Sequence, residues 1–192
     1  MKFINKKTIK IDREISDLDS FTLDFTKILE KNADYVIVSG YVAILLGRAR
    51  ASEDVDVIIP KIDFPKFQSL YTELKKNNFY CLNAEEVSTV YDYLKDNLAV
   101  RFAKNDTIIP NIEMKWIKSD FDRFALENTI DVNLSKGKLR ISHLELQIAF
   151  KEEVLKSPKD LEDARHLEKI AEGYLDNKLI NKYREMLREF YK

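Results

Sequence analysis

The chain has 192 residues, 45% of them hydrophobic, which is enough for one folded domain with a substantial core. Its 32 lysine and arginine residues balance 33 acidic residues, which excludes the strong positive charge that drives non-specific nucleic-acid binding. One cysteine and two histidines exclude an intramolecular disulfide and a multi-cysteine zinc site, so any metal ligands are carboxylates, which favour magnesium or manganese.

No apolar run nears the roughly 18 residues that a membrane span needs. The first residues, MKFINKKTIKID, do not form the apolar stretch of a signal peptide. We therefore expect a cytoplasmic protein without membrane contact.

The first half of the chain predicts alternating helices and strands. Apolar residues recur at helical spacing in two segments, and short β-branched runs indicate buried strands. In chain order we expect a strand-like start, a helix over Asp17–Lys31, a strand over Tyr35–Val38, a turn at Gly40, a short helix over Tyr41–Leu46, a strand over Asp54–Ile59 ended by Pro60, and a helix over Phe64–Lys76.

The second half begins with mixed signals and ends with helices only. Residues 81–97 predict a partly helical segment. Ala99–Lys104 and Thr107–Lys118 predict a hairpin turned at Asn105-Asp106, and Pro110 predicts an irregular start for its second arm. A second hairpin is expected around Ser135–Lys138, followed by helices over Ser142–Lys156, Pro158–Gly173 and Asp176–Tyr191.

These elements predict an α+β protein. The expected core, over residues 1–140, is a small mixed β-sheet with flanking helices. Residues 141–192 are expected to form a C-terminal helical bundle that packs on this core.

Asp54 and Asp56 lie one residue apart in the predicted strand DVDVII. Because side chains alternate along a strand, both carboxylates project to one face. Desolvating two unpaired neighbouring anions costs several kcal/mol or forces one to stay protonated. A divalent cation removes this cost, and a pair of such ions serves phosphoryl or nucleotidyl transfer, which requires a third carboxylate.

A Ser39-Gly40 turn precedes the short predicted helix. Backbone N–H groups at such a turn, together with the serine hydroxyl, suit an anion, and glycine lets a phosphate approach the main chain closely. The turn therefore indicates a phosphate-binding segment close to the two aspartates.

The order of these features resembles the DNA polymerase β-like nucleotidyltransferase superfamily, whose second motif matches Arg50-Ala-Ser-Glu-Asp-Val-Asp56. Within that superfamily the chain is most similar to small prokaryotic AbiE-type toxin nucleotidyltransferases. Their C-terminal helices carry a lysine and then Lys/Arg-Asp-x-x-Asp, which here correspond to Lys151 and Lys159–Asp163. The first motif departs from the family pattern, because Ser39-Gly40 stands where Gly-Gly or Gly-Ser is usual.

No motif identifies the third carboxylate. In the predicted strand before Trp116, Glu113 shares a face with Asn111 and Lys115, and we predict it as the third acid. Asp106 is the alternative, although a turn explains an aspartate there equally well.

The resemblance implies a magnesium- or manganese-dependent enzyme that moves a nucleoside monophosphate from an NTP to a hydroxyl acceptor. The acceptor is a tRNA or other RNA, a protein or a small molecule, and the family context implies the toxin of a type IV toxin–antitoxin pair with an antitoxin partner. The predicted catalytic residues are Asp54, Asp56, Glu113, Lys151 and Asp160, with the metal on Asp54, Asp56 and Glu113 and the nucleotide on Ser39, Gly40, Arg50 and Ser52.

Several of these residues also have structural explanations. Arg48 and Arg50 either contact the triphosphate or substrate, neutralise nearby aspartates or cap a helix C-terminus. Ser52 either binds nucleotide or bonds the local backbone. Asp160 completes a helix start after Ser157.

Lys151 and Asp163 form either part of a site or a helix–helix ion pair. The rival function is a catalytically silent member of the same fold that binds a nucleotide or a protein partner. A nucleic-acid-binding module is less favoured, because the sequence lacks a basic recognition helix.

Overall fold

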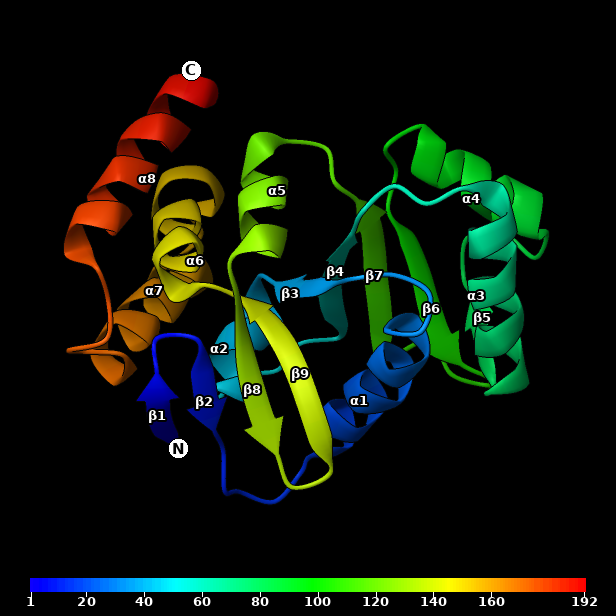
Figure 1. The fold of residues 1–192 in the computed structure, drawn as a ribbon, viewed down its shortest axis with the longest axis horizontal. Helices are drawn as coiled ribbons and strands as arrows, with labels where there is room; N and C mark the ends of the chain where they lie inside the picture. Colours follow the sequence, from blue (N-terminus) through cyan, green and yellow to red (C-terminus); the bar gives the residue numbers. More distant parts are fainter.

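A nine-stranded mixed sheet runs through the computed structural model, which describes residues 1–192 (Figure 1). The strand order is β1-β2-β8-β9-β3-β4-β7-β6-β5, which confirms the expected mixed sheet with flanking helices. The strands are β1 Lys2–Asn5, β2 Thr8–Lys10, β3 Val36–Val38, β4 Asp54–Ile59, β5 Phe79–Cys81, β6 Val100–Lys104, β7 Asn111–Trp116, β8 Thr129–Leu134 and β9 Gly137–Ser142.

The helices begin at the capping residues that the sequence offers. Ser16 and Ser119 form capping boxes, and Asp63 and Ser157 accept hydrogen bonds from the first turn of helices that begin with proline at their first or second position. The helices are α1 Asp17–Leu29, α2 Gly40–Leu45, α3 Phe64–Lys76, α4 Val87–Lys95, α5 Asp120–Glu127, α6 Leu144–Phe150, the π-type turn η1 Lys151–Leu155, α7 Pro158–Ile170 and α8 Asn177–Phe190.

The centre of the sheet places the predicted acids next to one another. β3 pairs antiparallel with β4, so that Val38 lies opposite Asp56. β4 pairs parallel with β7, so that Asp56 lies beside Glu113. Ser39 follows β3 directly and is therefore close to the aspartates of β4.

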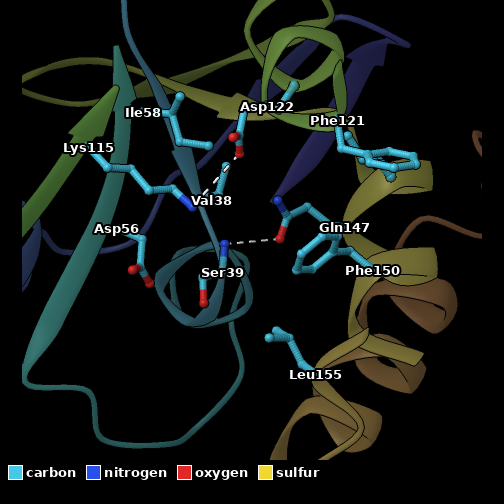
Figure 2. A pocket seen from close by; sticks show the side chains of 12 residues that line it. Val38, Ser39, Asp56, Ile58, Lys115, Phe121, Asp122, Gln147, Phe150 and Leu155 are labelled. Carbon is cyan, nitrogen blue, oxygen red and sulfur yellow. Dashed lines mark hydrogen bonds and ion pairs between the residues drawn. The ribbon is translucent and has the colours of Figure 1, made fainter. Parts of the chain in front are cut away.

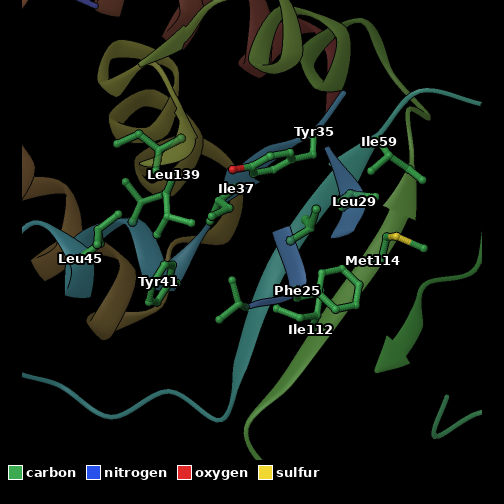
Figure 3. Packing of buried hydrophobic residues seen from close by; sticks show 14 of the residues in the cluster. Phe25, Leu29, Tyr35, Ile37, Tyr41, Leu45, Ile59, Ile112, Met114 and Leu139 are labelled. Carbon is green, nitrogen blue, oxygen red and sulfur yellow. The ribbon is translucent and has the colours of Figure 1, made fainter. Parts of the chain in front are cut away.

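The main hydrophobic core lies on the sheet face opposite Asp54 and Asp56. Figure 3 shows Phe25 of α1 with Ile112 of β7, and both side chains are fully buried in this core. The aromatic residues Phe67, Phe79 and Trp116 are buried, whereas Phe64 is half-buried.

The last helices group at one end of the sheet, and α3 and α4 lie at the other end (Figure 1). α6 packs against α7, η1 and α8, and α7 also packs against α2. Because these contacts join the helices to the core, the division into residues 1–140 and 141–192 stays a prediction. None of the helices combines the length and the apolar character needed to cross a membrane.

Candidate active site

A cleft of about 530 Å³ opens beside the first half of β4. It is bounded by the end of β3, the loop before β4 and the first turn of α7. Its lining residues are Ser39, Gly40, Arg50, Ala51, Ser52, Glu53, Asp54, Asp56, Lys159 and Asp160. Segments far apart in the sequence therefore meet around the two aspartates.

Asp54 and Asp56 are half-buried on the same face of β4, as strand parity predicts. Burial, together with the charge of the neighbouring Asp54 carboxylate, raises the pKa of Asp56 to about 6. Such a pair of crowded oxygen donors fits a hard divalent cation, because the cation neutralises charges that burial and repulsion disfavour.

Ser39 links β3 to α2 in a backbone conformation that L-residues rarely adopt, with φ 65° and ψ −138°. Its N–H donates a hydrogen bond to Oε1 of Gln147 at 3.1 Å. The predicted role of this turn as a set of free N–H donors is therefore limited, because one of them already has a partner in α6.

The side chain of Arg50 occupies the space beside Gly40 that a Cβ atom would fill. A Cβ atom on Gly40 would lie 1.7 Å from Nη2 of Arg50, so an alanine would displace the guanidinium. Arg50 Nε is buried without a hydrogen-bond partner and lies 3.5 Å from Oδ1 of Asp163. Burial lowers the pKa of Arg50, although the carboxylates of Asp160, Asp54 and Asp56 act in the opposite direction, and Arg50 lines the cleft together with these three acids.

Ser52 orients the first aspartate. Its Oγ lies 3.0 Å from the carbonyl oxygen of Asp54 and 3.2 Å from Oδ1 of the same residue. The local backbone bond that the sequence allows is thus present, and Ser52 also lines the cleft.

Glu113 lies beside Asp56 in the sheet, but its carboxylate is held by Arg101 of β6. Nε and Nη2 of Arg101 donate to Glu113 Oε2 at 2.9 and 2.6 Å. No group of three or more His, Cys, Asp or Glu side chains is gathered for a metal ion. The aspartate pair thus fits a cation, whereas the predicted third ligand is engaged elsewhere. Asp106, the alternative acid, lines a different cavity at the β6–β7 turn.

The residues predicted in the C-terminal helices form a buried ion cluster behind the cleft. Nζ of Lys151 lies 2.9 Å from Oδ2 of Asp163 and 3.6 Å from Oδ1 of Asp160. Arg48 reaches the same cluster, pairing with Asp163 and donating to the carbonyl oxygen of Lys159 at 2.8 Å. Of the catalytic residues predicted in these helices, Asp160 lines the cleft, and Lys151 does not.

Sequence reasoning missed a second pocket of about 170 Å³ that adjoins the cleft (Figure 2). It lies between the central strands and helices α5 and α6, and it shares Ser39 and Asp56 with the cleft. Its lining residues are Val38, Ser39, Asp56, Ile58, Lys115, Phe121, Asp122, Ala125, Leu146, Gln147, Phe150 and Leu155. The one available signal was the capping box at Ser119, which marks the start of α5.

The sequence matches no protein-family model and no curated protein. The solved structures that are similar over most of the chain include two of one protein and one of another. The crystal structure of ANT(2")-Ia in complex with adenylyl-2"-tobramycin gives a TM-score of 0.59 at 13% identity, and the alignment covers 92% of this chain and 100% of that chain.

The solution structure of the antibiotic-resistance factor ANT(2'')-Ia gives a TM-score of 0.54 at 16% identity, covering 92% of this chain and 95% of that chain. The crystal structure of an antigenic nucleotidyltransferase-like protein from Paracoccidioides brasiliensis gives a TM-score of 0.52 at 17% identity, covering 89% of this chain and 86% of that chain. At these identities the likeness establishes a shared fold.

Proposed function

We propose that this protein, which has a nucleotidyltransferase-like fold, is a metal-dependent enzyme that transfers a nucleoside monophosphate from an NTP to a hydroxyl acceptor. The observation that carries the proposal is the joint position of Asp54 and Asp56 in a cleft that also contains Arg50 and the Ser39-Gly40 turn. A bound magnesium or manganese ion supplies charge neutralisation for the triphosphate.

The residues of the chain have separate tasks in this proposal. Asp54 and Asp56 hold the cation, and Arg50, whose Nε lacks a hydrogen-bond partner, binds the triphosphate together with the Ser39 hydroxyl. The acceptor oxygen attacks the α-phosphorus and forms a new P–O bond. The bond from the α-phosphorus to its bridging oxygen breaks, pyrophosphate leaves with that electron pair, and the acceptor proton passes to the Glu113 carboxylate after it separates from Arg101.

The acceptor and the biological role are further parts of the proposal. ANT(2")-Ia is seen with an adenylylated tobramycin, so a small molecule is one acceptor class, beside RNA and protein. The clustering of Lys151 with Asp160 and Asp163 supports an AbiE-type toxin role, because these residues correspond to the C-terminal motif of that group. That role implies an antitoxin partner, and growth arrest after induced expression is the expected phenotype.

A catalytically silent nucleotide-binding protein is the second candidate. The bond between Arg101 and Glu113 favours it, because it engages the acid that lies beside Asp56 in the sheet. The two candidates agree on nucleotide binding and differ on transfer.

The test is transfer of label from each α-labelled NTP, with magnesium or manganese, into total RNA, cell protein and small-molecule acceptors. The wild type should transfer label, and Asp54→Asn/Asp56→Asn should not. A matched control is Asp92→Asn/Asp96→Asn, which removes two exposed carboxylates on and next to α4 and should retain transfer. Binding of NTP without transfer to any acceptor class would favour the silent member.

A further inference from the structure

The pocket between α5 and α6 has the size and walls of a site for one flat ring system. Its volume of about 170 Å³ is well below the roughly 300–1,000 Å³ of sites that enclose a drug-sized ligand. Phe121 and Phe150 contribute aromatic walls, and Val38 and Ile58 close the side of the sheet (Figure 2). A larger ligand can therefore insert only one ring system into this pocket, and the rest of the ligand lies outside it.

The aromatic walls are supported from behind by the end of the chain. Phe190 lies with its ring centroid 5.5 Å from that of Phe121, and Tyr191 lies 6.1 Å from Phe150. Leu155, which is 40% exposed, forms the apolar rim. These contacts hold the pocket open as a preformed space.

The pocket offers hydrogen-bond donors. Gln147 is only 6% exposed, and its Oε1 accepts the Ser39 N–H. This bond fixes the side-chain amide, so Nε2 is the end that faces the pocket, and it has no partner within the protein (Figure 2). Lys115 Nζ, 3.8 Å from Oδ1 of Asp122, is a second donor at the same wall. A donor that lines the pocket and has no partner in the protein is available to a ligand that carries an acceptor.

Ser39 and Asp56 line both this pocket and the cleft that holds the proposed triphosphate site. We propose that the pocket between α5 and α6 binds the nucleobase of the substrate NTP, and that the Gln147 amide donates to a ring carbonyl of that base. The inference rests on the proposed function, because the cleft must hold the triphosphate. Uracil, cytosine and guanine carry such a carbonyl, and adenine does not.

The experiment is calorimetric titration with magnesium and two kinds of ligand. The first kind is the α,β-methylene analogue of each NTP, in which the bond that transfer breaks cannot be cleaved. The second is inorganic tripolyphosphate, which has no base. The variants are Ala125→Leu, which fills the pocket from α5, and Leu155→Trp, which narrows its rim at an exposed position and so preserves folding. Glu127→Leu, exposed on the same helix, is the matched control.

We expect the UTP, CTP and GTP analogues to bind more tightly than the ATP analogue and than tripolyphosphate. Both pocket variants should weaken binding of these three analogues by at least about tenfold, which corresponds to about 1.4 kcal/mol. They should leave tripolyphosphate binding unchanged, and Glu127→Leu should behave as wild type.

Three outcomes would overturn the inference. Unchanged analogue binding in both pocket variants would place the base elsewhere, and unchanged binding with lost transfer would assign the pocket to the acceptor. An ATP analogue that binds as tightly as the others would remove the role of the Gln147 amide. Failure of the wild type to bind both tripolyphosphate and every analogue is a distinct result, because it would contradict the proposed function itself.

Discussion

Arg101 and Glu113 face each other across β6 and β7, and Nε and Nη2 of Arg101 both donate to Oε2 of Glu113. Glu113 is also the residue beside Asp56 in the parallel pair of β4 and β7. The third acid thus stands at the correct strand position, but a cation of the protein itself neutralises it. Binding of a metal ion by three acids requires Arg101 to release Glu113.

Replacing Arg101 with methionine should therefore tighten the binding of Mn²⁺ to the protein without nucleotide. Both partners are partly exposed, with side-chain exposures of 52% and 23%. An exposed ion pair is worth at most about 1 kcal/mol, so the expected gain in affinity is up to about fivefold. Titration with Mn²⁺ measures this change, because the electron-paramagnetic-resonance signal of free Mn²⁺ decreases as the ion binds.

Glu113→Gln supplies the matching background for that measurement. If Arg101 competes with the metal for Glu113, the gain from Arg101→Met should be clearly smaller when Glu113 is already an amide. An equal gain in both backgrounds would show that Arg101 acts on Asp54 and Asp56 only through its general positive charge.

Gly40→Ala should weaken NTP binding while leaving the fold intact. The new Cβ would meet the end of the flexible Arg50 side chain, so the free energy of unfolding should change by less than about 1 kcal/mol. A displaced guanidinium loses charge-assisted bonds to the triphosphate, worth about 1.5–3 kcal/mol, and the affinity should fall by about tenfold or more. Calorimetry with the α,β-methylene analogues measures the loss.

Arg50→Ala separates the two explanations of the glycine. Without the guanidinium the Cβ has room, so Gly40→Ala should add little to the loss caused by Arg50→Ala. A full additional loss in that background would mean that a phosphate approaches the main chain at Gly40, which is the role that the sequence suggests.

Asp56 should make stability depend on pH in the metal-free protein. Its pKa is raised from 3.8 to about 6, so between these values the folded state binds more protons than the unfolded state. The free energy of unfolding therefore falls as pH rises through this window, and the Asp56 contribution to this loss is complete above about pH 6. The difference in pKa corresponds to at most about 3 kcal/mol.

Asp56→Asn should remove this contribution. In urea titrations with a chelator, the variant should be more stable than wild type at pH 7 to 8, and the advantage should shrink towards pH 4. Asp92→Asn, at an exposed position, should show no such trend. A constant difference across the whole pH range would disprove the raised pKa of Asp56.

Local periodicity explains why much of the fold was predictable. Strand alternation placed Asp54 and Asp56 on one face, and helical spacing gave Phe64–Lys76 with the correct ends. Alternation also put Glu113 on one face with Asn111 and Lys115, but its position beside Asp56 comes from the pairing of β4 with β7. The α5 helix was missed because it has only eight residues and two of its members are buried, which is too little for a clear period.

Contacts between distant segments explain what the sequence could not give. The bonds from Arg101 to Glu113 and from Ser39 to Gln147 join positions 12 and 108 residues apart, and no local pattern encodes such a pair. The contact between Arg50 and Gly40 is a further example. Nη2 of Arg50 excludes a side chain at Gly40, but the two residues are separated in the sequence by helix α2. Chemistry-bearing residues were therefore identifiable, whereas their partners required the tertiary structure.

Lys151 is expected to act mainly through the ion cluster. Its side chain is 1% exposed, and its Nζ lies 2.9 Å from Asp163, which is fully buried. Lys151→Ala leaves that carboxylate without one of its cations and should reduce the free energy of unfolding by about 3–5 kcal/mol. Arg188→Ala, which breaks the pair between an exposed guanidinium and Glu153, should leave the free energy of unfolding almost unchanged.

Urea titration of both variants, combined with the transfer assay at low urea, distinguishes the two explanations of Lys151. A structural lysine predicts that Lys151→Ala unfolds at clearly lower urea and that the fraction still folded retains NTP binding. A variant that keeps the wild-type unfolding midpoint but loses transfer would instead give Lys151 a part in the reaction, which is the role that the resemblance to AbiE-type enzymes predicts.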